Sequence, residues 1–281
     1  DILIRPMPQA DFGINDSIQC LLNNQVSFTD NTSYSYSTYS VLWDFGDGDT
    51  STLLNPVHSY ATPDTYYVKL ISTSDYNCKD SITYAVYIMP MPVAEFSVND
   101  STQCLSGNQF SFTNTGSISS GTFNSNWDFD DANSSSSLNP SHTYSTYDSF
   151  LVLLILSSTF GCNDTVYHNM TVYPMPTAEF SFNDSSQCFN EHFIDLTNQT
   201  TIAYGSLTYL WTWGDGNSSN TLNPNHSYNT SDTFDVKLLA TSNYNCSDSI
   251  SKNAYIFPSP SPVFSITDSA QCLNTNIFQF K

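Results

Sequence analysis

Asp44 and Asp47 lie three positions apart in the segment WDFGDG (residues 43–48), next to two glycines. Carboxylate oxygens that converge on one point are the ligands that Ca²⁺ prefers, and paired carboxylates also carry out acid–base catalysis. His58 follows in NPVHSY, and imidazole is a common metal ligand. This part of the chain is therefore the first place to look for a metal site or a catalytic centre.

These residues belong to a sequence repeat with a constant period of 84 residues. The residues that return in register are Trp43, Trp127 and Trp211; His58, His142 and His226; Cys20, Cys104, Cys188 and Cys272; and Cys78, Cys162 and Cys246. The motif PMP begins at residues 6, 90 and 174, and PSP begins at residue 258. A repeat of this length predicts a tandem array of similar domains. We predict the boundaries 1–8 (last strand of a preceding repeat and linker), 9–92, 93–176 and 177–260 (three complete domains), and 261–281 (first strands of a following repeat).

The number and positions of the acidic residues change from repeat to repeat, whereas the tryptophans all keep the period. The first repeat has Asp44 and Asp47, whereas the third has Thr212 in place of the first of these acids. A metal or catalytic site needs its own set of ligands in each working copy. We therefore interpret WDFGDG as a core strand that runs into a tight glycine turn, with no catalytic centre. The tryptophans would fill the core, and weak calcium candidates remain at Asp44, Asp47 and Asp131.

The recurring histidines do not change this interpretation. They fall in three different predicted domains, so they cannot share one metal ion, and half-buried structural histidines are the simpler explanation. No GxSxG or similar nucleophile motif occurs in the chain. We expect a protein that is not an enzyme, with no cofactor except the weak calcium candidates.

The composition limits the class of protein. The 281 residues include 6 Lys and Arg against 26 Asp and Glu, and the formal charge of −20 excludes an electrostatic partner such as nucleic acid or an anionic membrane. Ser, Thr, Asn, Tyr and Phe are abundant, which favours short strands with polar turns. No apolar stretch is long enough to predict membrane insertion. The start DILIRPMP has none of the features of a signal peptide, so an export signal would lie outside this sequence.

Alternating apolar residues predict the strands of the first repeat at residues 10–14, 25–30, 39–45, 57–60, 65–72 and 81–88. In the third of these, Val41, Trp43 and Phe45 share one face. About seven short strands in 84 residues are typical of an immunoglobulin-like sandwich. The expected fold class is all-β, with three tandem sandwiches and partial repeats at both ends.

The segments YSVLWDFGDG, NPVHSY, TYYVKL and NCKDS together closely resemble the PKD domain, and the cysteine pattern is similar to that of Bacteroidota surface proteins. The resemblance covers all three repeats. It implies an extracellular spacer or adhesive module, which in some proteins accompanies a secreted hydrolase. Repeat two departs from the pattern with WDFDDA (127–132) and repeat three with WTWGDG (211–216).

The cysteines allow two pairings. Pairing within each repeat would join Cys20 to Cys78, Cys104 to Cys162 and Cys188 to Cys246. In a standard sandwich, however, Cys20 and Cys78 lie on turns at opposite poles, and a disulfide needs Cα atoms within about 7 Å. The favoured pairing therefore joins neighbouring domains, Cys20 to Cys162 and Cys104 to Cys246. Either pairing indicates an oxidising, extracellular setting.

Short Asp-Ser and Asp-Thr motifs are similar to the O-glycosylation sequence of Bacteroidota. Turn chemistry in a Ser- and Asp-rich chain explains them equally well. The candidate glycosylation sites are Ser17, Ser81, Ser101, Thr165, Ser249 and Ser269.

The expected function is a structural extracellular array that forms a stiff fibre, stalk or adhesin filament on, or shed from, a bacterial surface. Its partners would be neighbouring repeats of the same chain, with lateral self-association, glycans or surface proteins as further candidates. The proline linkers should hold successive domains nearly coaxial. The alternative is a glycan-binding or spacer accessory region of a larger secreted enzyme. Glycan binding would need an aromatic platform, for which the first repeat offers Tyr34, Tyr36 and Tyr39.

Overall fold

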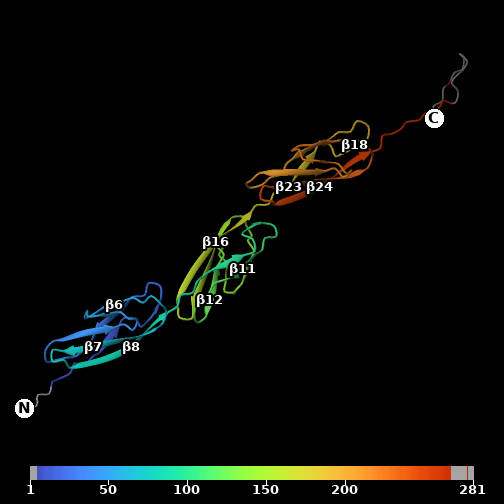
Figure 1. The fold of residues 1–281 in the computed structure, drawn as a ribbon. Helices are drawn as coiled ribbons and strands as arrows, with labels where there is room; N and C mark the ends of the chain where they lie inside the picture. Colours follow the sequence, from blue (N-terminus) through green and yellow to red (C-terminus); the bar gives the residue numbers. More distant parts are fainter. Residues whose placement is uncertain (1–4, 267–276, 278–281) are drawn as a thin grey trace, which may run out of the picture. The chain divides into compact units, whose positions relative to one another are not determined.

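The structure is a computed structural model that describes residues 5–266 and 277 (Figure 1). This part of the chain forms strands, turns and loops but no helix, and hence no helix that could cross a membrane. It divides into two compact units, the first containing residues 5–103 and 109–171 and the second containing residues 104–108 and 172–266. The first unit holds the first sandwich and most of the second, and the second unit holds the third.

The first sandwich contains eight strands in two sheets. They are β1 (Phe12–Ile14), β2 (Ile18–Cys20), β3 (Val26–Asp30), β4 (Tyr39–Asp44), β5 (Thr50–Ser51), β6 (Val57–His58), β7 (Thr65–Ser74) and β8 (Lys79–Met89). The smaller sheet has the order β1-β3-β6, and the larger sheet has the order β2-β8-β7-β4-β5. The immunoglobulin-like sandwich expected from the sequence is confirmed.

The second and third sandwiches repeat this arrangement strand for strand. The second has β9 (Phe96–Val98), β10 (Thr102–Cys104), β11 (Phe110–Asn114), β12 (Phe123–Asp128), β13 (Ser134–Ser135), β14 (Ser141–His142), β15 (Ser149–Ser158) and β16 (Asn163–Tyr173). The third has β17 (Phe180–Phe182), β18 (Ser186–Cys188), β19 (Ile194–Asn198), β20 (Leu207–Thr212), β21 (Ser218–Ser219), β22 (Asn225–His226), β23 (Thr233–Ser242) and β24 (Ser247–Phe257).

The first strand of each sandwich is split between the two sheets, which the sequence did not predict. β1 pairs antiparallel with β3, whereas β2 pairs parallel with the end of β8 and places Cys20 opposite Met89. The count of about seven strands therefore becomes eight, because β2 and β5 are too short to show an alternating pattern. Cys20 lies at the end of β2, just before the turn into β3.

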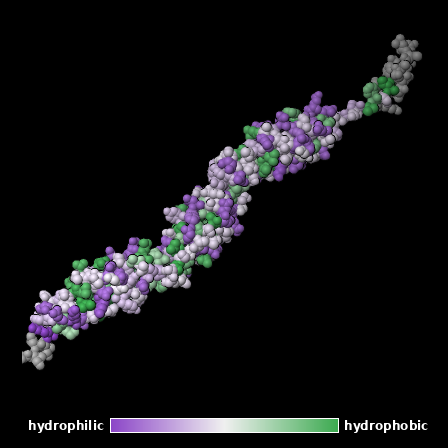
Figure 2. All heavy atoms as spheres, viewed as in Figure 1, coloured by the Kyte–Doolittle hydropathy of each residue, from purple (hydrophilic) through white to green (hydrophobic). Residues whose placement is uncertain are grey.

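The core lies between the two sheets and is largely aromatic. Trp43, Trp127 and Trp211 have no exposed surface, and Val41 and Phe45 are also buried. The alternation of β4 explains this, since every second side chain points inward. Each indole N–H donates to a backbone carbonyl, of Leu53, Ser137 and Thr221, at 2.9, 2.9 and 3.0 Å. Exposed hydrophobic residues form separate patches on the visible surface (Figure 2).

Candidate functional site

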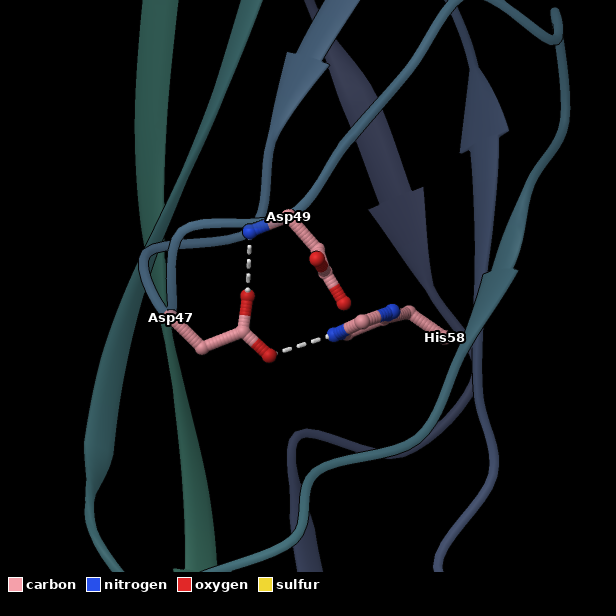
Figure 3. A group of neighbouring side chains, drawn as sticks. All are labelled: Asp47, Asp49 and His58. Carbon is pink, nitrogen blue, oxygen red and sulfur yellow. Dashed lines mark hydrogen bonds and ion pairs between the residues drawn. The ribbon is translucent and has the colours of Figure 1, made fainter.

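The acidic turn that follows β4 is built around a hydrogen-bonded Asp–His pair. In the first sandwich, Asp47 Oδ2 lies 2.6 Å from His58 Nε2 (Figure 3), and the two side chains are 20% and 12% exposed. The His58 ring stacks on Phe45 with centroids 4.2 Å apart. Asp47 also accepts a hydrogen bond from the Asp49 N–H. The pair thus ties the turn to β6 and covers the end of the core.

The other two sandwiches contain the same pair. His142 Nε2 lies 2.8 Å from Asp131 Oδ2, and His226 Nε2 lies 2.7 Å from Asp215 Oδ2. These imidazoles stack on Phe129 and Trp213. The aspartate that recurs in register is therefore the one that bonds to histidine. These aspartates and the recurring histidines both keep the period of 84, but their spacing did not predict that they bond to each other.

The charge state of the turn follows from these bonds. Burial disfavours the ionised form of Asp47, but the hydrogen bonds from His58 and the backbone outweigh burial and lower the pKa of the carboxyl. The pKa values of Asp131 and Asp215 are lowered in the same way. The aspartates are thus held as carboxylates that accept hydrogen bonds.

Three potential metal ligands meet in the first turn. Ligand atoms of Asp47, Asp49 and His58 lie within 4.8 Å of one another, and Figure 3 shows the three side chains converging. Asp49 is replaced by Asn133 and Asn217 in the other repeats, yet the Asp–His pair persists there. The Asp–His pair therefore forms whether or not a third potential metal ligand is present, which indicates a structural role. Asp44, one of the calcium candidates, accepts from the Gly46 N–H within the turn. Calcium binding at Asp44, Asp47 and Asp131 stays a prediction.

Disulfides cross between neighbouring repeats. Cys20 bonds to Cys162 with Cα atoms 5.6 Å apart, and Cys104 bonds to Cys246 with Cα atoms 5.5 Å apart. Both pairs span 142 residues. Cys78 and Cys188 are free thiols, so the structure contains no disulfide within a single repeat among the described residues. Cys272 lies outside the described residues.

A second feature accompanies each disulfide. The strand residue beside the first cysteine lies near the aromatic residue that precedes the second cysteine by two positions. Tyr173 stacks on Tyr244 with centroids 4.0 Å apart, whereas Met89 and Phe160 line one hollow in the first unit. Arg5, at the equivalent position before the first sandwich, lies 3.7 Å above the Tyr76 ring. In all three sandwiches, this aromatic residue thus lies near the residue that precedes the linker into the same sandwich.

The candidate glycosylation sites occupy two kinds of position. Ser81, Thr165 and Ser249 are exposed near the start of the last strand of each sandwich. The aspartates before them accept backbone hydrogen bonds from Ala10, Ala94 and Ala178, so the Asp of each motif has a structural role of its own. Ser101 is exposed and Ser17 is half-buried, and their carbonyl oxygens accept from Thr171 and Tyr87. Ser269 lies outside the described residues, and glycosylation stays a prediction.

A buried polar residue between β2 and β3 was not predicted from the sequence. Asn24 donates to the carbonyls of Leu21 and Tyr60 and accepts from the Tyr60 N–H. In the third repeat His192 takes this place, with Nδ1 bonded to the Phe189 carbonyl and Nε2 accepting from the Tyr228 N–H. A carbonyl cannot donate, so His192 must carry its proton on Nδ1. The signal was hidden because the residue type changes between repeats.

The fold and its repeated features define a tandem array of immunoglobulin-like β-sandwiches. The family model of the PKD domain matches residues 5–89, 89–172 and 174–257. The chain therefore belongs to the PKD domain family. The family match also agrees with the resemblance found in the sequence, although a Bacteroidota origin is not part of it.

Several solved structures resemble this chain in fold. The PKD1 domain of the Vibrio cholerae metalloprotease PrtV is 23% identical, with a TM-score of 0.27, and covers 30% of this chain and 98% of its own. Three N-terminal domains of the bacteriophage RB49 capsid protein Hoc are 8% identical, with a TM-score of 0.42, and the match covers 90% of this chain and 99% of the Hoc chain. A structure of a 1.5-MDa bacterial ice-binding adhesin is 9% identical, with a TM-score of 0.33, and the match covers 91% of this chain and 98% of the adhesin chain. At these identities the likeness concerns the fold alone. None of the curated proteins compared with the chain matches it.

Proposed function

We propose that the chain is part of a structural extracellular array, a stiff fibre, stalk or adhesin filament on, or shed from, a bacterial surface. The observation that carries the proposal is the pair of disulfides between neighbouring repeats. Each junction then has two covalent connections, the linker and the disulfide. A hinge between domains needs one flexible connection, and a second bond restrains bending about the first.

The linkers support the same function. Pro90 and Pro92 are buried, as are Pro174 and Pro176. Proline fixes φ and restricts the residue before it, so these joints lose little entropy when they are ordered. Burial of a rigid linker favours a spacer that holds neighbouring domains at a set distance.

Persistence of the disulfides requires an oxidising compartment, which supports an extracellular location. PKD domains and disulfides are both typical of extracellular proteins. The formal charge of −20 keeps such an array soluble and disfavours anionic surfaces. Glycans, surface proteins and lateral copies of the array remain the proposed partners.

A glycan-binding accessory role is less well supported. Tyr34, Tyr36 and Tyr39 do gather, with ring centroids 6.3 and 6.4 Å from Tyr34, and Tyr36 is 72% exposed. The equivalent loop of the second repeat, however, places Ser119 and Ser120 in the hollow beside Met89. In the second repeat this surface therefore faces the first repeat. The tyrosines occupy the same surface of the first repeat, where a preceding repeat would lie.

The test is imaging of the chain by electron microscopy and small-angle scattering, with and without a reductant. We expect nearly straight particles under oxidising conditions and a broader distribution of angles after reduction, with each sandwich still folded. A chain with Cys20→Ser and Cys162→Ser should bend at one junction only. Variably bent particles under oxidising conditions would overturn the stiff array.

A further inference from the structure

The hairpin that carries the second cysteine of each disulfide has the same construction in all three sandwiches. Its sequence is aromatic–X–Cys, as in Tyr76-Asn77-Cys78. The Ser74 N–H donates to the Cys78 carbonyl at 2.9 Å, and Ser158 and Ser242 form the same bond with Cys162 and Cys246 at 2.8 Å. The middle residue is left-handed each time, with φ of 62°, 84° and 64° at Asn77, Gly161 and Asn245. We call this the aromatic–X–Cys hairpin.

The surface that receives the hairpin is also repeated. It consists of the cysteine that ends the second strand and the strand residue paired beside it. In the first sandwich these are Cys20 and Met89, and the Leu21 N–H donates to the Met89 carbonyl at 2.9 Å. In the second sandwich they are Cys104 and Tyr173, joined through the Leu105 N–H at 2.9 Å. Both copies are occupied by a hairpin.

The third copy of this surface is complete, and no hairpin within residues 5–266 lies on it. Cys188 pairs with Phe257 across β18 and β24, and the Phe189 N–H donates to the Phe257 carbonyl at 2.8 Å. Cys188 is an exposed free thiol, whereas Cys20 and Cys104 are half-buried in their disulfides. Phe257 is 53% exposed, whereas Met89 and Tyr173 are half-buried. The third copy therefore exposes a large apolar side chain and a thiol at the positions that are half-buried in the other two copies.

The following linker shows the same contrast. Pro258 and Pro260 are exposed, although the equivalent prolines at both earlier junctions are buried. The sequence PSPSPVF (258–264) corresponds to PMPVAEF (90–96), which opens the second repeat. The chain thus leaves the third sandwich with the residues that begin a repeat.

We propose that Cys188 and Phe257 form a docking site for the aromatic–X–Cys hairpin of a fourth PKD repeat in the same polypeptide. The cysteine of this hairpin forms a disulfide with Cys188. The aromatic residue of the hairpin packs against Phe257 as Tyr244 packs against Tyr173. This inference extends the proposed array because it names the partner of the third sandwich.

Formation of the disulfide needs an oxidant, here a small-molecule or protein disulfide. One thiolate attacks a sulfur of the oxidant and releases a thiol. The second cysteine, after losing its proton, attacks the resulting mixed disulfide and releases a second thiol. Two cysteines are oxidised and one disulfide is reduced, so protons and electrons balance.

The test extends the chain by one repeat in register. Residues 1–272 are followed by a second copy of residues 189–260, so that the copied Tyr244 and Cys246 lie at the position of the fourth hairpin. Cys78→Ser and Cys272→Ser remove competing thiols. After refolding with a glutathione redox pair, peptide mass spectrometry should link Cys188 to the copied Cys246. In the matched three-repeat chain Cys188 should react fully with iodoacetamide.

A second variant separates docking from chance oxidation. Phe257→Ala should slow formation of the Cys188 disulfide about two- to fivefold, the loss expected for one aromatic pair, and leave the other two disulfides unchanged. A four-repeat chain in which Cys188 stays free, or bonds to a second molecule, while Cys20–Cys162 and Cys104–Cys246 form would overturn the docking site. That result would leave the proposed function of the three existing repeats intact.

Discussion

The interior of the sandwiches and the junctions between them keep their structure in different ways. Inside, the central tryptophan returns in every sandwich as Trp43, Trp127 and Trp211, each with no exposed surface, although other core positions change residue type. At the junctions the side chains change, from Met89 and Phe160 in one to Tyr173 and Tyr244 in the other. The disulfides, the hairpin backbone and the buried linker prolines recur there.

The difference follows from what holds each region together. A closely packed core loses contacts when a side chain changes shape, and no other force replaces them. A junction held by a covalent bond tolerates different contacts beside it. The disulfide thus fixes the geometry, and the neighbouring pair adds a smaller, exchangeable contribution.

Removal of a core indole should have the largest effect. Trp127→Ala should lower the free energy of unfolding of the second sandwich by about 3–5 kcal/mol, because it leaves a cavity between the sheets. Hydrogen exchange with mass spectrometry, read separately for each sandwich, measures this. Asn126→Ala, on the exposed face of the same strand, is the matched control and should change stability by less than about 0.5 kcal/mol. Similar effects for the two variants would contradict the contrast between interior and surface.

Loss of one disulfide should come next. Cys104→Ser with Cys246→Ser should lower stability by about 2–4 kcal/mol, because the bond closes a long loop in the unfolded chain. Urea titration monitored by tryptophan fluorescence follows the change, and the sandwiches should remain folded without denaturant. The free thiols provide the control, since Cys78→Ser with Cys188→Ser breaks no bond. An equal loss of stability in both double variants would refute the structural role of the disulfide between Cys104 and Cys246.

The Asp–His turn should contribute less and should depend on pH. Asp131→Asn removes a carboxylate that accepts from His142, at a cost of about 1–2 kcal/mol at pH 7. The folded pKa of Asp131 lies below its usual value of 3.8 because hydrogen bonds outweigh burial, which opposes ionisation. Its stabilisation is therefore present above about pH 4 and is lost as the pH falls through the folded pKa.

Urea titrations of the second sandwich at pH 7 and pH 3 measure this difference. The variant should lose less stability than the wild type between these values. Asp47→Asn is the matched change, which should affect the first sandwich instead. Parallel pH profiles of Asp131→Asn and wild type would show that the Asp–His pair is not a source of acid sensitivity.

The aromatic pair at a junction should have the smallest effect. Tyr173→Ala should weaken the contact by about 0.5–1 kcal/mol, and the loss should appear only when the disulfide is absent. Limited proteolysis of the linker at residues 174–176 should then be about two- to fivefold faster under reducing conditions and unchanged under oxidising ones. Tyr167→Ala removes an exposed ring from the same strand and serves as control. Faster cleavage in the oxidised chain would mean that the pair, and not the disulfide, fixes the junction.

The sequence predicted those parts of the fold whose burial alternates over many residues. Strand β7 has buried side chains at every second position over ten residues, and a pattern of this length is readable without a structure. β2 and β5 have three and two residues. Their pairing depends on the neighbouring strand and leaves no periodic signal, so the split first strand could not be foreseen.

The sites show the same limit. The spacing of the cysteines left two pairings open, because only the positions of the hairpins at the poles of each sandwich decide between them. Asn24 and His192 make equivalent hydrogen bonds with different chemistry, so a search for recurring residues passes over them. The approach of Asp49 to His58 depends on a turn whose sequence changes in every repeat.

The two disulfides also change how tension passes along the chain. Force that enters before Cys20 can cross directly to Cys162, so the intervening segment cannot be drawn out while the bond is intact. At about 3.3 Å per residue, a separation of 142 residues corresponds to roughly 470 Å of extended chain that is shielded in this way. The loop closed by Cys104 and Cys246 overlaps the first. The shortest covalent route from Cys20 to Cys246 therefore contains only the 58 residues between Cys104 and Cys162, so a load on the ends can draw out roughly 190 Å of chain between these two cysteines at most, even where a sandwich has unfolded.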